Sequence, residues 1–171
     1  MDPDSLRALR GSGESVSPAR VLFLPYPGRD PPMIYWAPIF HFYQPPTQFP
    51  SVLKKICDES YRPLIGLLGE FERARATVNI NGALTEMLAD CGHQDVIEGL
   101  RALAAAGRIE FVESAKYHPI LPLIPDSEIR RQIALNRATN RRAFGDAYRP
   151  VGFFPPELAY EIGRASCRER V

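Results

Sequence analysis

Polar side chains of a few chemical kinds recur at four places in this 171-residue sequence, each directly after an apolar run. They are His41, Tyr43 and Gln44, then Asn79 and Asn81, then Glu113, Lys116, Tyr117 and His118, and last Glu157 and Tyr160. Amide, imidazole and carboxylate groups can form the paired hydrogen bonds that sugar hydroxyls require. Aromatic rings such as Trp36 can pack on the apolar C–H faces of a sugar. The residue types therefore indicate a carbohydrate site, provided that the fold brings the four places together.

The apolar runs are typical of buried strands, and they alternate with helical segments. We expect strands at 33–41, 73–80, 108–114 and 149–157, and helices at 51–71, 81–107 and 126–145. Crossovers of this length return the chain to the same end of a sheet, so the strands should pair in parallel. An open doubly wound sheet and a (β/α) barrel both fit this order, and both carry chemistry at the carboxyl ends of the strands. The first strand is not followed by a glycine-rich phosphate loop, which argues against a dinucleotide-binding fold.

Helix boundaries are indicated by a few residues. Ser51 and Asp126 are expected to be N-caps, and Pro63 is expected to break or restart the first helix. The second helical stretch should divide near Gly92 and end at Gly107. The apolar residues that recur at helical spacing in the last helix are Ile129, Ile133, Leu135 and Ala138.

The composition excludes several classes of protein. Lysine and arginine number 21 against 20 acidic residues, so no global charge favours nucleic acid or an anionic membrane. No apolar run approaches the roughly 18 residues of a membrane span. Residues 1–30 are expected to form a poorly ordered leader without the features of a signal peptide. The cysteines, Cys57, Cys91 and Cys167, form neither a disulfide framework nor a zinc pattern, so we expect a cytoplasmic protein.

Each candidate side chain also has a structural interpretation. His41 at a strand end can be a satisfied structural histidine, and Gln44 beside Pro45 can stabilise a turn. His118 before a proline can fix an extended segment. Glu157 after two prolines can be the acid that starts a helix. Cys91 and His93 lie away from the strand ends and are interpreted as structural.

Three segments of the sequence together resemble a known family. "WAPIFHFYQPP", "GRIEFVESAKYHPILPLIP" and "GFFPPELAY" resemble the first three motifs of glycoside hydrolase family 57, in the family's order. The resemblance covers about Met33 to Tyr160. It implies the N-terminal part, about four β/α units, of an incomplete (β/α)7 barrel. It also implies a retaining enzyme that acts on α-glucans or related oligosaccharides or polysaccharides by hydrolysis, transfer or branching, with no cofactor and no metal.

The resemblance implies roles for individual residues. His41 and Gln44 match the first motif, in which the family's second histidine is replaced by Tyr43. His118 matches the second motif, as Glu110 does. The family's catalytic nucleophile falls on Glu157. Substrate contacts are accordingly expected from His41, Tyr43, Gln44, Trp36, Asn81 and His118.

The family's fourth motif, which supplies an aspartate as general acid, has no counterpart in this sequence. The last residues, "EIGRASCRERV", can be encoded by a string that matches a common sequencing adapter. We therefore interpret 31–161 as a partial family 57 catalytic barrel and 162–171 as a non-native tail. Such a fragment should lack activity and should leave a sheet edge and apolar surface uncovered.

Two other functions stay open on the sequence. One is a metal-dependent polysaccharide deacetylase-like hydrolase with His41 and His118 as ligands, although no Asp-Asp or His-x₃-His cluster accompanies them. The other is a non-catalytic carbohydrate-binding relative of the family.

Overall fold

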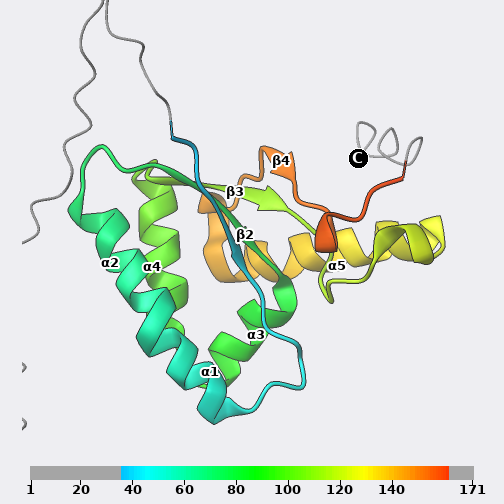
Figure 1. Ribbon diagram of the computed structural model, residues 1–171, viewed down its shortest axis with the longest axis horizontal. Helices are drawn as coiled ribbons and strands as arrows, with labels where there is room; N and C mark the ends of the chain where they lie inside the picture. Colours follow the sequence, from blue (N-terminus) through cyan, green and yellow to red (C-terminus); the bar gives the residue numbers. More distant parts are fainter. Residues whose placement is uncertain (1–35, 162–171) are drawn as a thin grey trace, which may run out of the picture. The chain divides into compact units, whose positions relative to one another are not determined.

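The computed structural model describes residues 36–161, which contain a parallel four-stranded sheet in the order β1-β2-β3-β4. The strands are β1 (Ile39–Phe42), β2 (Ala76–Ile80), β3 (Ile109–Glu113) and β4 (Gly152–Phe153) (Figure 1). The expected parallel α/β order is therefore confirmed. The proposed leader at 1–30, the tail at 162–171 and the expected start of the first strand at Met33 lie outside the described residues.

The helices follow the expected places along the chain, with different boundaries. They are α1 (Pro50–Ile56), α2 (Arg62–Glu70), α3 (Gly82–Asp90), α4 (Gln94–Ala105) and α5 (Asp126–Phe144). A π-helical turn, η2 (Cys57–Tyr61), joins α1 to α2, and short 3₁₀ turns lie at η3 (Leu121–Leu123), η4 (Gly145–Ala147) and η5 (Pro156–Leu158). No helix in residues 36–161 has the length and apolar character needed to cross a membrane.

The expected helix ends were partly wrong at the N-terminal side. α1 begins one residue before Ser51, at Pro50, and Phe49 is its N-cap without a side-chain hydrogen bond. Proline suits a first helical position because its missing N–H has no partner there in any case. Asp126 is likewise the first residue of α5 and not its cap, since Pro125 holds that position.

Two other helix boundaries were predicted correctly. Pro63 stands in the first turn of α2, directly after the π-helical turn, and so restarts the helix. The second stretch divides between α3 and α4 around Gly92, whose φ is +78°, and ends before Gly107, whose φ is +66°. Both values are readily adopted only by glycine.

The alternation of side chains along the strands separates two faces of the sheet. Phe42, Val78, Ile80 and Phe111 belong to a buried apolar core, together with residues of α3 and α4 such as Leu84, Leu88, Val96 and Leu100. His41, Asn79 and Glu110 lie between them in sequence and so lie on the opposite face. This face, free of the apolar core, carries the candidate site at the carboxyl ends of the strands.

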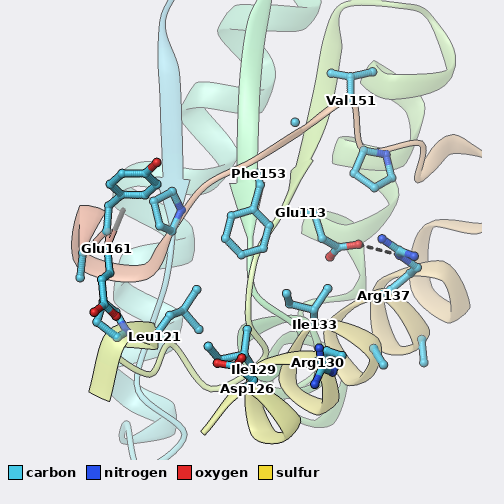
Figure 2. Close-up of a pocket in the computed structure, with 18 of the residues that line it drawn as sticks. Glu113, Leu121, Asp126, Ile129, Arg130, Ile133, Arg137, Val151, Phe153 and Glu161 are labelled. Atoms are coloured by element: carbon cyan, nitrogen blue, oxygen red, sulfur yellow. Dashed lines mark hydrogen bonds and ion pairs between the residues drawn. The ribbon is translucent and has the colours of Figure 1, made fainter. Parts of the chain in front are cut away.

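The buried face of α5 is polar, which the apolar spacing of the helix did not predict. Its buried residues are Gln132, Asn136, Thr139, Asn140 and Phe144. Ile129 and Ile133 instead line a groove of about 790 Å³, together with Leu121, Val151 and Phe153 (Figure 2). The expected uncovered apolar surface is therefore present, next to β4, which has β3 as its one neighbour among the described strands.

Candidate functional site

The candidate site begins where β1 and β2 pair side by side. The sheet register places His41 opposite Asn79, so both side chains lie on the same face of neighbouring strands. His41 Nδ1 lies 2.7 Å from Asn79 Oδ1. Asn79 is fully buried, whereas His41 is exposed. The register of the two parallel strands thus pairs an exposed imidazole with a buried amide.

A stack of four rings extends from His41 across the strand ends. The His41 ring lies 4.9 Å from the His118 ring and 4.9 Å from the Phe154 ring, measured between centroids. Tyr43 stacks on His118, with 4.3 Å between the centroids of the two rings. The four rings come from β1 and the residue after it, from the segment after β3 and from the segment after β4. Together with Asn79, which bonds to His41, they bring together the ends of all four strands.

Glu157 reaches this stack from an unusual backbone turn. Pro155 precedes η5, and Glu157 and Leu158 have φ values of +55° and +53°. The Glu157 side chain is 64% exposed, and its Oε1 lies 3.4 Å from His118 Nδ1. Glu157 lies in the first turn of η5, as an acid that starts a helix would, but η5 is a three-residue 3₁₀ turn and Glu157 itself has non-helical backbone angles.

The Glu157 turn is held against β3 by two hydrogen bonds to Phe154. The Phe154 backbone N–H donates to the carbonyl of Glu113 at 2.8 Å. The Ser114 hydroxyl donates to the Phe154 carbonyl at 2.9 Å. Ser114 was not singled out in the sequence, because a small hydroxyl at a strand end carries no signal of its own.

The electrostatics of the site favour a neutral histidine beside the carboxylate. Burial lowers the pKa of His118, the nearby His41 imidazole lowers that pKa further, and the Glu157 carboxylate opposes both effects. Burial also raises the pKa of Tyr43, as does the Glu157 carboxylate. At neutral pH, His118 therefore has one N–H, which can donate to Glu157 from Nδ1. Its Nε2 is buried without a hydrogen-bond partner.

The backbone of His118 also corrects an expectation. The interpretation that His118 only fixes an extended segment before Pro119 is wrong, because its φ is +54°. This left-handed conformation turns the chain and buries the imidazole, whose side chain is 4% exposed.

The structure does not bring the other predicted substrate-binding residues into this group. Asn81 is fully buried, and its amide donates to the carbonyl of Ala115 at 3.2 Å. Gln44 accepts a hydrogen bond from Gln48 at 3.0 Å. Trp36 is 84% exposed and precedes β1, so it lies at the amino-terminal end of the strand, whereas the site lies at the carboxyl ends.

Glu113, which also follows a strand, serves a different purpose. It is 4% exposed and accepts hydrogen bonds from Asn136 at 2.7 Å, from Arg137 at 2.9 Å and from Tyr148 at 2.9 Å. Figure 2 shows the pair of Glu113 and Arg137 beside the groove of α5. Because Asn136 and Arg137 both belong to α5, this carboxylate joins β3 to α5.

Lys116 is also bonded to another side chain. It is 7% exposed, and its ammonium donates to Glu86 at 2.7 Å. Of the two acids that the sequence placed at strand ends, Glu113 is buried and Glu157 is largely exposed to solvent. In residues 36–161 no three histidine, cysteine or acidic residues are grouped in a way that could hold a metal ion.

Comparison with known proteins identifies the family. Residues 39–164 match the family described as glycosyl hydrolase family 57. The chain belongs to glycosyl hydrolase family 57. The match covers all four strands and Glu157, so the site described above lies within the family region.

Several family 57 relatives resemble this chain over most of its length. It is 30% identical over 121 residues to an α-amylase of Pyrococcus horikoshii, which covers 71% of this chain and 18% of that protein. It is 35% identical over 128 residues to α-amylase 1 of Dictyoglomus thermophilum, which covers 75% and 18%. The chain thus spans about a fifth of the length of these curated relatives.

Solved structures support the fold described here. The 4-α-glucanotransferase of Thermococcus litoralis superposes with a TM-score of 0.70 at 28% identity, covering 78% of this chain and 21% of that one. The α-amylase AmyC of Thermotoga maritima superposes with a TM-score of 0.66 at 18% identity, covering 76% and 37%, which supports the fold alone.

Proposed function

We propose that this chain is part of a retaining α-glucan-active glycoside hydrolase or 4-α-glucanotransferase in which Glu157 is the nucleophile. The observation that carries the proposal is the position of Glu157, exposed on a left-handed turn at the end of β4 and 3.4 Å from His118. The names of the relatives, α-amylase and 4-α-glucanotransferase, support the α-glucan as substrate class.

The chemistry follows from a carboxylate in this position. A Glu157 oxygen would attack the anomeric carbon, while the bond from that carbon to the leaving sugar oxygen breaks and that oxygen takes a proton from a general acid. The oxygen of water, or of a hydroxyl on a second sugar, would then attack the same carbon and give its proton to the deprotonated general acid, while the bond to Glu157 breaks and frees the carboxylate. Water gives hydrolysis and a sugar hydroxyl gives transfer. A retaining enzyme needs its second carboxyl group about 5–5.5 Å from the first.

The residues around Glu157 would bind and orient the sugar. The His118 N–H would hold the nucleophile's carboxylate, and His41 and Tyr43 would hydrogen-bond sugar hydroxyls. The Phe154 ring offers an apolar face beside His41. We propose that the protein works in the cytoplasm, which fits the buried free thiol of Cys57.

The test uses a protein that contains this chain together with the remainder of a family 57 catalytic domain. Glu157→Gln should lower the rate of maltooligosaccharide cleavage and transfer by about 10⁴-fold or more, since residues that act as nucleophile carry losses of this order. Glu98→Gln, an exposed carboxylate on α4, is the matched control and should keep full activity. With Glu157→Ala, added azide should yield a glycosyl azide of inverted configuration. Retained activity in Glu157→Gln would refute the assignment.

A second proposal concerns the activity of the chain by itself. The 171-residue chain should not turn over α-glucans, because it contains no counterpart of the expected general acid.

We also propose that residues 162–171 are a translated adapter and not protein. The nucleotide record decides this point, because codons that differ from the adapter string would contradict it.

A further inference from the structure

The Asn79 side chain is fully buried at the carboxyl end of β2, yet one of its polar atoms has no partner. Its Oδ1 contacts His41 Nδ1 at 2.7 Å, while its Nδ2 has no hydrogen bond. Burying an amide N–H without a partner costs about 1–3 kcal/mol. Packing alone does not explain an amide at this position, because an apolar side chain would avoid this cost. We therefore ask what the contact of Asn79 Oδ1 with His41 contributes to offset the cost of the unpaired Nδ2.

The ring contacts of His41 leave one feature of the imidazole undetermined. The rings of Phe154 and His118, each 4.9 Å away, restrict the plane of the His41 ring. They do not distinguish that ring from the same ring turned over by half a rotation, because an aromatic face contacts both orientations equally well. The hydrogen bond to Asn79 does distinguish them, since an oxygen that only accepts requires a nitrogen that donates.

We propose that Asn79 is the positioning residue for His41, holding the imidazole in the Nδ1–H form so that Nε2 offers a lone pair to a donating hydroxyl. The hydrogen bond made by one ring nitrogen sets the state of the other. A sugar hydroxyl is a suitable donor to Nε2. That last step rests on the proposed function, whereas the hydrogen-bond state of His41 does not.

The register of the sheet makes this assignment specific to one asparagine. Asn79 is paired directly with His41 in the β1–β2 ladder. Asn81, two residues on, follows the end of β2 and gives its amide to Ala115. Asn81→Ala is therefore a matched control, because it removes an equally buried amide that does not touch His41.

The test is nitrogen-15 NMR of the imidazole rings in the 171-residue chain, at a pH at which histidines are neutral. The sequence holds three histidines, so His93→Gln and His118→Gln assign the signals. The expected result is His41 with its proton on Nδ1. Asn79→Ala should move that proton to Nε2, the form that a free histidine side chain prefers in water, and Asn81→Ala should leave it on Nδ1.

Asn79→Asp gives a second answer that does not depend on the alanine variant folding. A carboxylate can only accept, so His41 should keep its Nδ1 proton. If the amide of Asn79 in fact donates to His41 through Nδ2, then Asn79→Asp would change the protonated nitrogen, and the proposal would be overturned. An Nε2–H signal in the unaltered chain would overturn it as well. Because these spectra require no glucan, their result is independent of whether Glu157 proves to be the nucleophile.

Discussion

Helices α3, α4 and α5 all connect strands of the same sheet, but α3 and α4 bury mainly apolar side chains whereas α5 buries mainly polar ones. Leu84, Leu88, Val96 and Leu100 of α3 and α4 are fully buried among other apolar side chains. Over most of its length α5 buries amides and a hydroxyl. The Asn136 amide donates to Glu113, and the Asn140 amide accepts from Thr85 and donates to the Ile80 carbonyl. Its apolar residues Ile129 and Ile133 line the open groove beside β4 (Figure 2), whereas Phe144 at its end belongs to the apolar core.

The difference shows that one apolar pattern can have two outcomes. A stripe of apolar residues on a helix predicts a face that packs against other apolar groups, but it does not identify the segment that supplies them. On α3 and α4 the covering partner lies in the described chain. On α5 the face that meets the chain is the polar one. The stability of the two regions should therefore respond to different substitutions.

The largest effect is expected in the apolar core. Leu100→Ala should lower the free energy of unfolding by about 2–5 kcal/mol, because Leu100 is fully buried and its removal leaves a cavity. Urea denaturation of both chains measures the difference. A loss below about 1 kcal/mol would show that this core is not well packed.

A smaller loss is expected from the polar region. Tyr148 is 2% exposed, and its hydroxyl donates to Glu113 at 2.9 Å while accepting from Asn136 and Asn140 at 3.3 Å. Tyr148→Phe should cost about 1.5–3 kcal/mol, the range for a hydrogen bond to a charged group. Tyr160→Phe, at a position that is 63% exposed, serves as the control. If Tyr148→Phe were neutral in denaturation, hydrogen bonds would not hold α5 in place.

The site should add a pH dependence that neither region shows. Because the pKa of folded His118 lies below its ordinary value of 6.5, the unfolded chain binds a proton between these two pH values that the folded chain does not. The free energy of unfolding should therefore fall as the pH decreases from about 7 through the folded pKa, by at most about 1.4 kcal/mol per pH unit from this group.

The His118 contribution can be separated from those of other groups. The pKa values of Asp58, Asp95 and Glu128 are lowered from ordinary values near 4, so these acids act at lower pH. Denaturation of His118→Gln across the same pH range should show a flatter dependence above pH 5. An unchanged slope in this variant would assign the effect to another group.

The smallest effect is expected in the groove. Ile133 is half-buried there, and Ile133→Ala should change the free energy of unfolding by only about 0.5 kcal/mol. The same variant should bind less of a dye that fluoresces on apolar surfaces. A loss as large as that of Leu100→Ala would mean that the groove is closed in solution.

Local signals in the sequence were enough to predict the order of elements. The strands at β2 and β3, the division of α3 from α4 and the roles of Gly92 and Gly107 depend on neighbouring residues, and the structure has them where they were expected. The predicted cap of α1 at Ser51 was wrong by two positions and that of α5 at Asp126 by one. Several residues near a helix start can serve as its cap, and the backbone geometry selects among them.

The candidate site was predictable in outline and not in its details. The rule that parallel strands carry chemistry at their carboxyl ends located His41, Tyr43, His118 and Glu157. Asn79 was passed over for Asn81, because the contact with His41 joins residues 38 apart and depends on strand register. The polar network of α5 was missed for the same reason, since Asn140 and Thr85 are 55 residues apart.

At the left-handed turn, the residue that best suits the backbone conformation of position 157 differs from the residue that carries a carboxylate. Glycine adopts a φ of +55° freely, whereas any other residue pays about 1 kcal/mol or more for it. Thermal stability thus favours glycine at position 157, whereas the proposed role as nucleophile requires the carboxylate. A programme that ranks variants of this chain by melting temperature alone would favour glycine there, and its most thermostable products would be the ones that had lost the carboxylate.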